Sequence, residues 1–288
     1  MAARQLGSSE VGGPTNIQKG GEMSDIEKIV GINDDSKPNM GRIYDFFLGG
    51  NHNFEVDRHY AEKVLEELPL APKMARLVRW FLVAAARTLS SQGFTQFVDF
   101  ASGLPVSDHI HHSTPPGTKV VYSDNDDVTV AYGQDILGET QYVLYLKGDV
   151  KDPLEILNDE QVSEFLDRSR KTAIGLNGIT YFMEDEQVRL TTETLFEWAN
   201  KGDRLFLCDS SMTSLGSNTT QIYRDMKTPI NMHSEEQMSR LVGRWTPVKP
   251  GYRLLEEWVK IDGTSLSIAD QERTTVGGNF YGVIYEKR

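Results

Sequence analysis

The sequence contains a single cysteine, Cys208, among 288 residues, so an internal disulfide is impossible. It has no CxxC or HExxH spacing of the kind that builds zinc sites. No apolar run approaches the ~18 residues that a membrane-spanning helix needs. A lone cysteine within an apolar run is typical of a reducing compartment. We therefore expect a cytoplasmic protein with no membrane partner and no metal.

Positive charge is also scarce in this chain. Lys and Arg number 30 against 42 Asp and Glu, which gives a formal net charge of −12. A surface of this sign repels phosphate backbones, and no basic stripe with interleaved aromatic residues is present. The sequence therefore predicts no nucleic-acid partner.

The chain is long enough for one large α/β domain with an added cap. Residues 1–22 are rich in Gly and Ser and lack the apolar region of a signal peptide, so we interpret them as a disordered leader or expression remnant. We expect an N-terminal helical cap over residues 23–92. The core would then occupy residues 93–288, with a lid-like insertion near 211–233.

Two apolar runs dominate the first half of the predicted core. Residues 97–100 are expected to form a buried strand that ends in the small-residue loop after Asp99, and residues 119–122 a second strand that Asp124 closes. Gly103 and Asp124 lie 21 positions apart, the spacing at which a strand–helix–strand unit brings a carboxylate beside the first loop. A carboxylate there can accept hydrogen bonds from both ribose hydroxyls of a nucleoside cofactor.

The loop itself distinguishes between nucleoside cofactors. Dinucleotide sites use three glycines to approach a pyrophosphate, whereas this loop has Ala101 and Pro105 around a single Gly103. Asp99 at its start would repel a pyrophosphate but would suit the ammonium group of a methionine moiety. The pattern favours S-adenosylmethionine over NAD, although an ordinary turn of an α/β protein is the structural alternative.

The stretch from Arg42 to Asp57 combines helical apolar spacing with a turn that is dense in Gly, Asn and His. Ile43 and Phe47 would bury one helix face, and Gly49 and Gly50 would end that helix. The turn either contacts a ligand or only joins two helices that pack on the sheet.

Three histidines, at positions 109, 111 and 112, invite a metal interpretation. No carboxylate or cysteine partner stands at ligand spacing, so we expect these side chains to cap or hydrogen-bond locally. Asp149 follows a third predicted strand, residues 142–146, and would either accept from an adenine amino group or cap the next helix.

A fourth predicted strand begins at Lys171 and would lie beside the first, so its end falls at the switch point of the sheet, with Asn177, Gly178 and Tyr181 as candidate ligand residues. Strands are also predicted over 204–210, 254–261 and 281–285. Residues 277–279 would then form the turn of a terminal hairpin. Five βα units closed by a hairpin predict the seven-stranded, mostly parallel α/β sheet of a Rossmann-like class I methyltransferase.

These motifs together resemble the bacterial S-adenosyl methyltransferase family, formerly a domain of unknown function that is common in actinobacteria. The resemblance covers roughly residues 40–288 and is most specific in the first half. It rests on the segments 42–54, 57–58, 99–105 with His111, 120–126 and 149–153.

The resemblance implies that the loop after the first strand and Asp124 bind the cofactor, that Asp149 lies near adenine, and that residues 42–53 fold over the cofactor. The residues expected to bind S-adenosylmethionine are Arg42, Tyr44, Gly49, Gly50, Asn51, Asp99, Ala101, Ser102, Gly103, His111, Asp124, Asn125, Asp149, Val150 and Asn177. The sequence departs from the family at Ala101, where glycine is usual, and at residues 178–181.

The predicted activity is methyl transfer to a small organic molecule, on oxygen, nitrogen or carbon, within secondary metabolism. Tyr181 and His233 are the candidate general bases. The alternatives are a cofactor-binding sensor without catalysis and an NAD(P)-dependent oxidoreductase.

Overall fold

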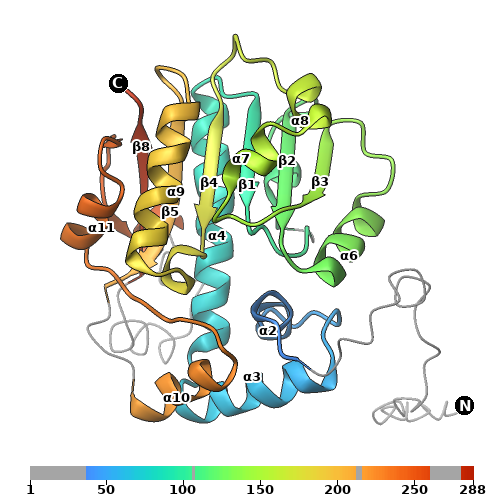
Figure 1. Cartoon of the computed structure of the whole chain (residues 1–288), viewed down its shortest axis with the longest axis vertical. Helices are drawn as coiled ribbons and strands as arrows, with labels where there is room; N and C mark the ends of the chain where they lie inside the picture. The colour runs from blue at the N-terminus through green and yellow to red at the C-terminus, as the bar shows by residue number, and fades with distance from the viewer. Residues whose placement is uncertain (1–36, 106–107, 212–215, 260–279) are drawn as a thin grey trace, which may run out of the picture.

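The computed structural model describes residues 37–105, 108–211, 216–259 and 280–288, which build a central sheet flanked by helices (Figure 1). Within this part of the chain the sheet has eight strands in the order β3-β2-β1-β4-β5-β8-β6, and β7 also pairs with β8. The strands are β1 (Gln96–Phe100), β2 (Lys119–Asp124), β3 (Val143–Lys147), β4 (Ala173–Asn177), β5 (Arg204–Ser210), β6 (Thr246–Pro247), β7 (Arg253–Leu254) and β8 (Phe280–Glu286).

Strands β1 to β5 are parallel, and β8 runs antiparallel to β5, β6 and β7. The strand order reverses between β1 and β4, where Asp99 pairs in register with Gly175. Ligands of open α/β sheets bind at the carboxyl ends of strands beside such a reversal. The predicted fold class, a mostly parallel Rossmann-like α/β sheet, is confirmed, although the sheet of the described residues has eight strands where seven were predicted.

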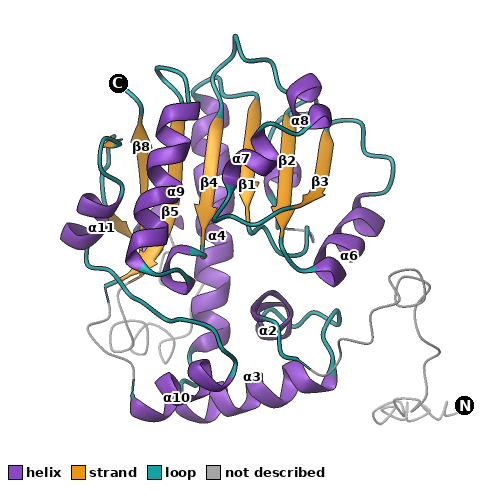
Figure 2. Cartoon of the chain, viewed as in Figure 1, coloured by secondary structure: helices purple, strands orange, loops and turns teal. Residues whose placement is uncertain are grey.

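Helices cover both faces of the sheet and form a further layer beyond its carboxyl edge (Figure 2). One face packs against α4, α5, α6 and α12, and the other against α7, α8, α9 and α11. The helices are α2 (Met40–Phe47), α3 (Glu55–Glu67), α4 (Ala71–Ser91), α5 (Ile110–Ser113), α6 (Asp127–Leu137), α7 (Pro153–Leu157), α8 (Glu160–Phe165), the 3₁₀ helix η1 (Thr180–Phe182), α9 (Asp185–Trp198), α10 (Ser217–Asp225), α11 (Glu235–Leu241) and α12 (Leu255–Val259).

Helix α4 connects the sheet to the outer helical layer. Its sequence carries a continuous apolar stripe and a proline in its first turn, where the missing N–H costs no hydrogen bond. The later turns pack against the sheet through residues such as Phe81 and Ala85, whereas Ala71 and Ala75 belong to a cluster with α2, α3 and α10. The helix therefore extends past the carboxyl ends of the strands (Figure 1).

A buried ion pair anchors the outer layer. The Arg42 guanidinium of α2 lies 2.7 Å from Asp57 of α3 and 3.2 Å from Asp126, which caps α6 after β2. Phe54 lies against the same guanidinium, 4.9 Å from ring centroid to Cζ. These contacts hold α2 and α3 together and tie both to the loop after β2.

The strand predicted over residues 254–261 is wrong. The chain forms only the two-residue strand β7 there and then turns into α12. Leu255 is fully buried, and Trp258 packs edge-to-face on Phe81 of α4 with ring centroids 5.4 Å apart. A residue spacing of three suits a helix, so packing against α4 overrides the strand propensity of this segment. The predicted hairpin turn at 277–279 and the leader at 1–22 lie outside the described residues.

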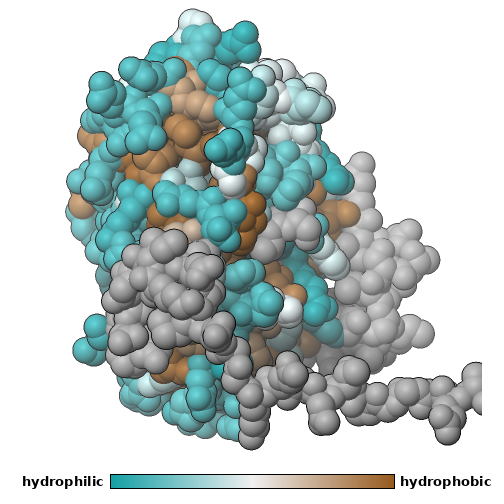
Figure 3. Space-filling model, turned by 90° about the vertical axis from the view of Figure 1, so that its right-hand side faces the viewer, coloured by the Kyte–Doolittle hydropathy of each residue, from teal (hydrophilic) through white to brown (hydrophobic). Residues whose placement is uncertain are grey.

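The described surface is mainly hydrophilic on the side that Figure 3 shows, with hydrophobic residues in small patches. Large exposed apolar side chains such as Ile136, Tyr142 and Leu154 are separate in the sequence, which is ordinary for a globular protein. None of the helices in the described ranges combines the length and apolar composition that a bilayer crossing requires.

Candidate functional site

A cleft of about 760 Å³ opens at the carboxyl ends of β1, β2 and β4, under α2 and beside α4. Eight of the predicted cofactor residues line it, together with several that the sequence analysis did not select. The lining residues are Asn39, Met40, Gly41, Tyr44, Val78, Arg79, Leu82, Asp99, Ala101, Ser102, Gly103, Asp124, Asn125, Asn177, Gly178, Ile179 and Phe182.

Asp99 lies at the floor of this cleft with 2% of its surface exposed. Its Oδ1 is buried and has no hydrogen-bond partner within the described part of the chain. Burial raises the pKa of this carboxyl to about 7, although the nearby Arg79 guanidinium opposes the shift. A buried carboxylate with a free oxygen is costly unless a positive group binds it. The site is therefore suited to a cation.

The loop after β1 has two residues in the left-handed region of backbone space. Gly103 has φ +62°, which glycine adopts freely, and Ala101 has φ +51°, which an L side chain adopts only with strain. The Ser102 hydroxyl donates to the Asp99 carbonyl at 2.6 Å, which closes the turn.

Asp124 ends β2 and faces this loop. Its Oδ2 accepts a hydrogen bond from the Gly103 N–H at 3.1 Å, and its Oδ1 accepts one from the Asp126 N–H at 3.1 Å. Burial raises the pKa of the carboxyl to about 6 in spite of these two donors. The predicted proximity of Gly103 and Asp124 is confirmed, and each carboxylate oxygen retains room to accept from a second donor.

Two aromatic side chains hold the carbonyls of the loop. The Tyr145 hydroxyl donates to the Gly103 carbonyl at 2.8 Å. The His109 Nδ1 accepts from the Ile110 N–H, so its Nε2–H donates to the Ser102 carbonyl at 3.3 Å. Burial keeps the pKa of His109 well below its usual range, which makes this neutral tautomer the stable form.

Arg79 of α4 is the most informative lining residue that sequence reasoning missed. Its side chain is 5% exposed, donates to the Leu104 carbonyl at 3.4 Å, and lies 5.6 Å from the Tyr44 ring centroid. A lone arginine between the buried Val78 and Leu82 was the available signal, because helices rarely bury a cation without a use for it.

Asn177, at the end of β4, shows a second unsatisfied group. Its Nδ2 donates to the Val78 carbonyl at 3.2 Å, whereas its buried Oδ1 has no hydrogen-bond partner in the described ranges. Both unpaired oxygens, on Asp99 and Asn177, belong to residues that line the cleft. They fit a ligand that carries ammonium, hydroxyl or amino hydrogens.

Other predicted cofactor residues lie outside the cleft lining. Gly49 ends α2 with φ +83°, and a Cβ on Gly50 would come within 2.0 Å of Asp45, so this turn is built around the Asp45 carboxylate. That carboxylate also accepts hydrogen bonds from His52 and Asn53. Asn51 is exposed. Their placement favours the structural alternative for the turn.

The remaining predicted residues lie at the rim or behind the loop. Arg42 is engaged in its buried ion pair, and His111 Nδ1 bonds to the Tyr122 hydroxyl at 2.9 Å. Asp149, half-buried after β3, accepts from the Lys151 N–H at 3.0 Å, and Val150 is buried beneath it. Since Gly148 donates to the Asp124 carbonyl, this turn borders the end of β2 that holds Asp124.

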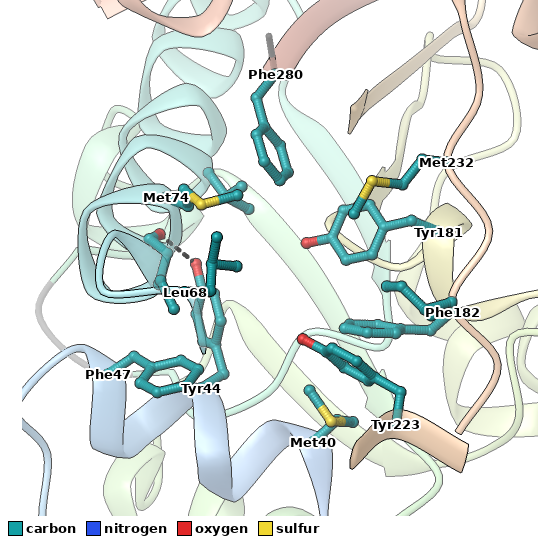
Figure 4. A pocket seen from close by; sticks show the side chains of 14 residues that line it. Met40, Tyr44, Phe47, Leu68, Met74, Tyr181, Phe182, Tyr223, Met232 and Phe280 are labelled. Atoms are coloured by element: carbon teal, nitrogen blue, oxygen red, sulfur yellow. Dashed lines mark hydrogen bonds between the residues drawn. The ribbon is translucent and has the colours of Figure 1, made fainter. Parts of the chain in front are cut away.

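A second pocket, of about 620 Å³, adjoins the cleft and is apolar. The two share Met40, Tyr44, Val78 and Phe182 as a common wall. Figure 4 shows the Tyr181 and Tyr223 side chains pointing into the pocket, while the Tyr44 hydroxyl donates to the Ala75 carbonyl at 2.7 Å. The aromatic rings come from four separate parts of the chain: α2, η1, α10 and β8.

The two candidate bases occupy different places. Tyr181 lines the apolar pocket, and burial keeps its pKa well above the usual range. His233 is 2% exposed, and its ring nitrogens lie 3.0 Å from Asp209 and 3.3 Å from Asp185. Burial lowers the pKa of His233, but the Asp209 hydrogen bond and charge outweigh it, so the net shift is upward.

The described residues contain no group of three His, Cys, Asp or Glu side chains placed to hold a metal ion. The histidines at 109, 111 and 112 hydrogen-bond locally or stack, with the rings of His111 and His112 3.9 Å apart.

Comparison with solved structures places the fold among methyltransferases. A candidate methyltransferase from Thermobifida fusca is 29% identical, with a TM-score of 0.77 over 88% of this chain and 97% of that one. A DUF574 family protein from Streptomyces avermitilis is 24% identical, with a TM-score of 0.79 over 88% and 99%. No curated protein matches the sequence.

The family model of the S-adenosyl methyltransferases matches residues 29–283, and the chain belongs to this family. It is an S-adenosylmethionine-dependent methyltransferase, in agreement with the resemblance noted from its motifs. The alternative of an NAD(P)-dependent oxidoreductase has no support from the family or the fold.

Proposed function

We propose that the cleft binds S-adenosylmethionine with its ribose on Asp124 and its methionine ammonium on Asp99. The observation that carries this proposal is the pair of buried carboxylates at the ends of neighbouring strands, one of which has an unpaired oxygen. Arg79, which lines the same cleft, supplies a positive partner for the methionine carboxylate. Asp149 stays a prediction as the partner of the adenine amino group.

When bound, S-adenosylmethionine supplies an electrophilic methyl group on a sulfonium centre. The protein then has to align the acceptor with that group and exclude water. Because the pocket and the cleft share lining residues, an acceptor in the pocket would lie beside the cofactor site, and α2 supplies residues to both. Because burial keeps the Tyr181 hydroxyl protonated, Tyr181 acts as a hydrogen-bond donor that orients the acceptor rather than as a base.

The acceptor in this proposal is a small organic molecule, because the adjoining pocket is only about 620 Å³ and is lined by side chains of α2, α4, η1, α10 and β8. A role in secondary metabolism and a cytoplasmic location are compatible with such a substrate and complete the proposal. His233 serves to fix the 230–233 segment, which supplies Ile230 and Met232 to the pocket.

Titration calorimetry with S-adenosylmethionine and S-adenosylhomocysteine tests the cofactor site. We expect saturable binding by the wild type and at least tenfold weaker binding by Asp124→Ala and Asp99→Asn. Asp135→Asn, on the exposed face of α6, is the matched control and should bind like the wild type. Unchanged affinity in both cleft variants, with folding verified by circular dichroism, would refute the placement.

A methyl-transfer assay distinguishes a methyltransferase from a protein that only binds and senses the cofactor. The experiment incubates the protein with S-adenosylmethionine carrying a labelled methyl group and a panel of small organic acceptors. Label appearing in an acceptor supports the proposal, whereas tight cofactor binding without transfer to any member of a broad panel favours the sensor.

A further inference from the structure

The apolar pocket differs from the cleft in its charge. The cleft lining includes Arg79, Asp99 and Asp124, whereas the described residues that line the pocket include no Asp, Glu, His, Lys or Arg. The pocket is lined by Met40, Tyr44, Phe47, Leu68, Ala71, Met74, Ala75, Val78, Tyr181, Phe182, Tyr223, Ile230, Met232 and Phe280. A charged group that enters such a site leaves water without gaining a counter-charge from this lining.

We propose that this pocket is the acceptor site and that it selects an uncharged molecule with a mainly apolar body. The inference rests on the proposed function, because the wall shared with the cleft places the pocket beside the cofactor. Its rings form a continuous set, with centroids of Tyr181 and Phe182 4.6 Å apart, Tyr181 and Phe280 5.9 Å apart, and Phe182 and Tyr223 6.1 Å apart. Aromatic walls of this kind bury a large flat surface with few conformational costs.

A positively charged acceptor is disfavoured for a further reason. The reacting methyl group stands on a sulfonium, which is itself a positive centre. A cation in the pocket would face that positive charge, and the described lining of the pocket offers no carboxylate to offset it. An anion would be left in the same apolar lining without a cation to donate a hydrogen bond to it.

Two hydroxyls give the pocket its polar character. The side chains of Tyr181 and Tyr223 point into it, and neither hydroxyl bonds to another lining residue (Figure 4). Burial raises the pKa of Tyr223 to about 12 and keeps that of Tyr181 well above its usual range, so both stay protonated and can donate. The acceptor should therefore carry an oxygen or nitrogen lone pair within an otherwise apolar skeleton.

A matched pair of fluorescent probes tests the charge selection. N-phenyl-1-naphthylamine is uncharged, and 1-anilinonaphthalene-8-sulfonate has the same skeleton with a negative charge. In the presence of S-adenosylhomocysteine we expect saturable binding of the uncharged probe and at least tenfold weaker binding of the sulfonate. Equal or tighter binding of the sulfonate, or no saturable binding of the uncharged probe, would overturn the proposal.

Variants at Met232 locate the binding. Met232 is half-buried in a connecting segment and lines the pocket but not the cleft. Met232→Trp fills the pocket and should weaken the uncharged probe at least tenfold, whereas the volume-conserving Met232→Leu should stay within twofold. Affinity for S-adenosylmethionine, measured by calorimetry, should be unchanged in both variants and shows that each is folded. A Met232→Trp protein that retains full probe affinity contradicts the assignment.

The hydroxyls have their own test by competition. We expect 2-acetylnaphthalene to displace the uncharged probe several-fold better than 2-ethylnaphthalene, because only the ketone accepts a hydrogen bond. The double variant Tyr181→Phe/Tyr223→Phe should bring that ratio close to one. If the two compounds displace the probe equally well from the wild type, the proposed hydrogen bonds from Tyr181 and Tyr223 to the acceptor are refuted.

Failure of the proposed function gives a different pattern. If the protein binds no S-adenosylmethionine but keeps its preference for the uncharged probe, the cofactor assignment fails and the pocket chemistry stands. Conversely, Asp99→Asn should lose cofactor affinity while its binding of the uncharged probe in buffer alone matches the wild type. Loss of both activities in Asp99→Asn, in a protein that melts cooperatively, would contradict two separate sites.

Discussion

Gly175 of β4 lies opposite Asp99 of β1, and a Cβ at position 175 would come within 2.2 Å of Asp99 Oδ1. It would also lie 2.6 Å from the Phe206 ring of the next strand. Because Gly175 has no side chain, β4 leaves the space that the buried Asp99 carboxyl occupies.

Gly175→Ala should therefore destabilise the protein and displace Asp99. We expect a loss of about 1–3 kcal/mol in the free energy of unfolding, the usual range for overpacking a core, together with weaker cofactor binding. Urea denaturation measures the first effect and calorimetry the second. In a double-mutant cycle, Asp99→Ala should restore part of the lost stability; strict additivity of the two changes would show that the clash does not occur.

Cofactor affinity should rise with pH between about 5.5 and 7.5. Burial raises the pKa of Asp99 to about 7 and that of Asp124 to about 6, so both carboxyls are partly protonated at the lower pH. A bound ammonium favours the ionised form of Asp99, and binding near pH 6.5 should release protons. Calorimetry in two buffers with different ionisation enthalpies measures this release, and Asp99→Asn should flatten the profile while Asp135→Asn leaves it unchanged.

The carboxyls of Asp99 and Asp124 also determine whether the free energy of unfolding of the unliganded protein rises or falls with pH. Their folded pKa values lie above the value of about 3.9 for an unfolded aspartate, so their contribution is present at low pH and is lost as the pH rises through 6 and 7. Asp124→Asn should reduce this decline, and a decline of equal size in the variant would argue against the assignment.

Ala101→Gly should stabilise the protein. Ala101 has φ +51°, where an L residue is strained by about 1–2 kcal/mol, and the extra chain entropy of an unfolded glycine offsets about 0.4–1 kcal/mol of the relief. The net gain should be about 0.5–1 kcal/mol, visible as a higher melting temperature. Ala84→Gly, in the interior of α4, is the control and should lose about 1 kcal/mol. A lower melting temperature for Ala101→Gly would exclude strain at this position.

Arg42→Ala should be among the most damaging single changes in the outer helical layer. It leaves the fully buried Asp57 without its cation, and removing one member of a buried pair costs about 3–5 kcal/mol. Urea unfolding measures the loss. Arg189→Ala breaks an exposed pair on α9 and should lower the free energy of unfolding far less. Similar losses in the two variants would show that burial does not strengthen the Arg42 pair.

The part of the fold that depends on local sequence patterns could be predicted from the sequence. The two apolar runs before Asp99 and Asp124 form β1 and β2, and the interval between Gly103 and Asp124 becomes the hydrogen bond that joins them. Such features depend on a few neighbouring residues and on the handedness of parallel connections. The predicted fold class followed from them.

Features that depend on distant contacts could not be predicted in the same way. The helix α12 forms because Leu255 and Trp258 pack on α4, more than 150 positions earlier in the chain. The lining role of Arg79 depends on the path of α4 over the loop after β1, which no local pattern records. The apolar pocket likewise draws its rings from α2, η1, α10 and β8, so its existence is a property of the assembled fold.

Helix α4 borders both cavities, and different turns of the helix supply the residues that line each one. Ala71, Met74 and Ala75 in its first turns line only the acceptor pocket, while Arg79 and Leu82 one to two turns later line only the cleft. Substitutions at the first-turn positions leave the side chains that line the cleft itself unchanged. New acceptors can thus be explored at positions 71 to 75, by natural drift or by directed evolution, in a scaffold whose cofactor chemistry is inherited intact.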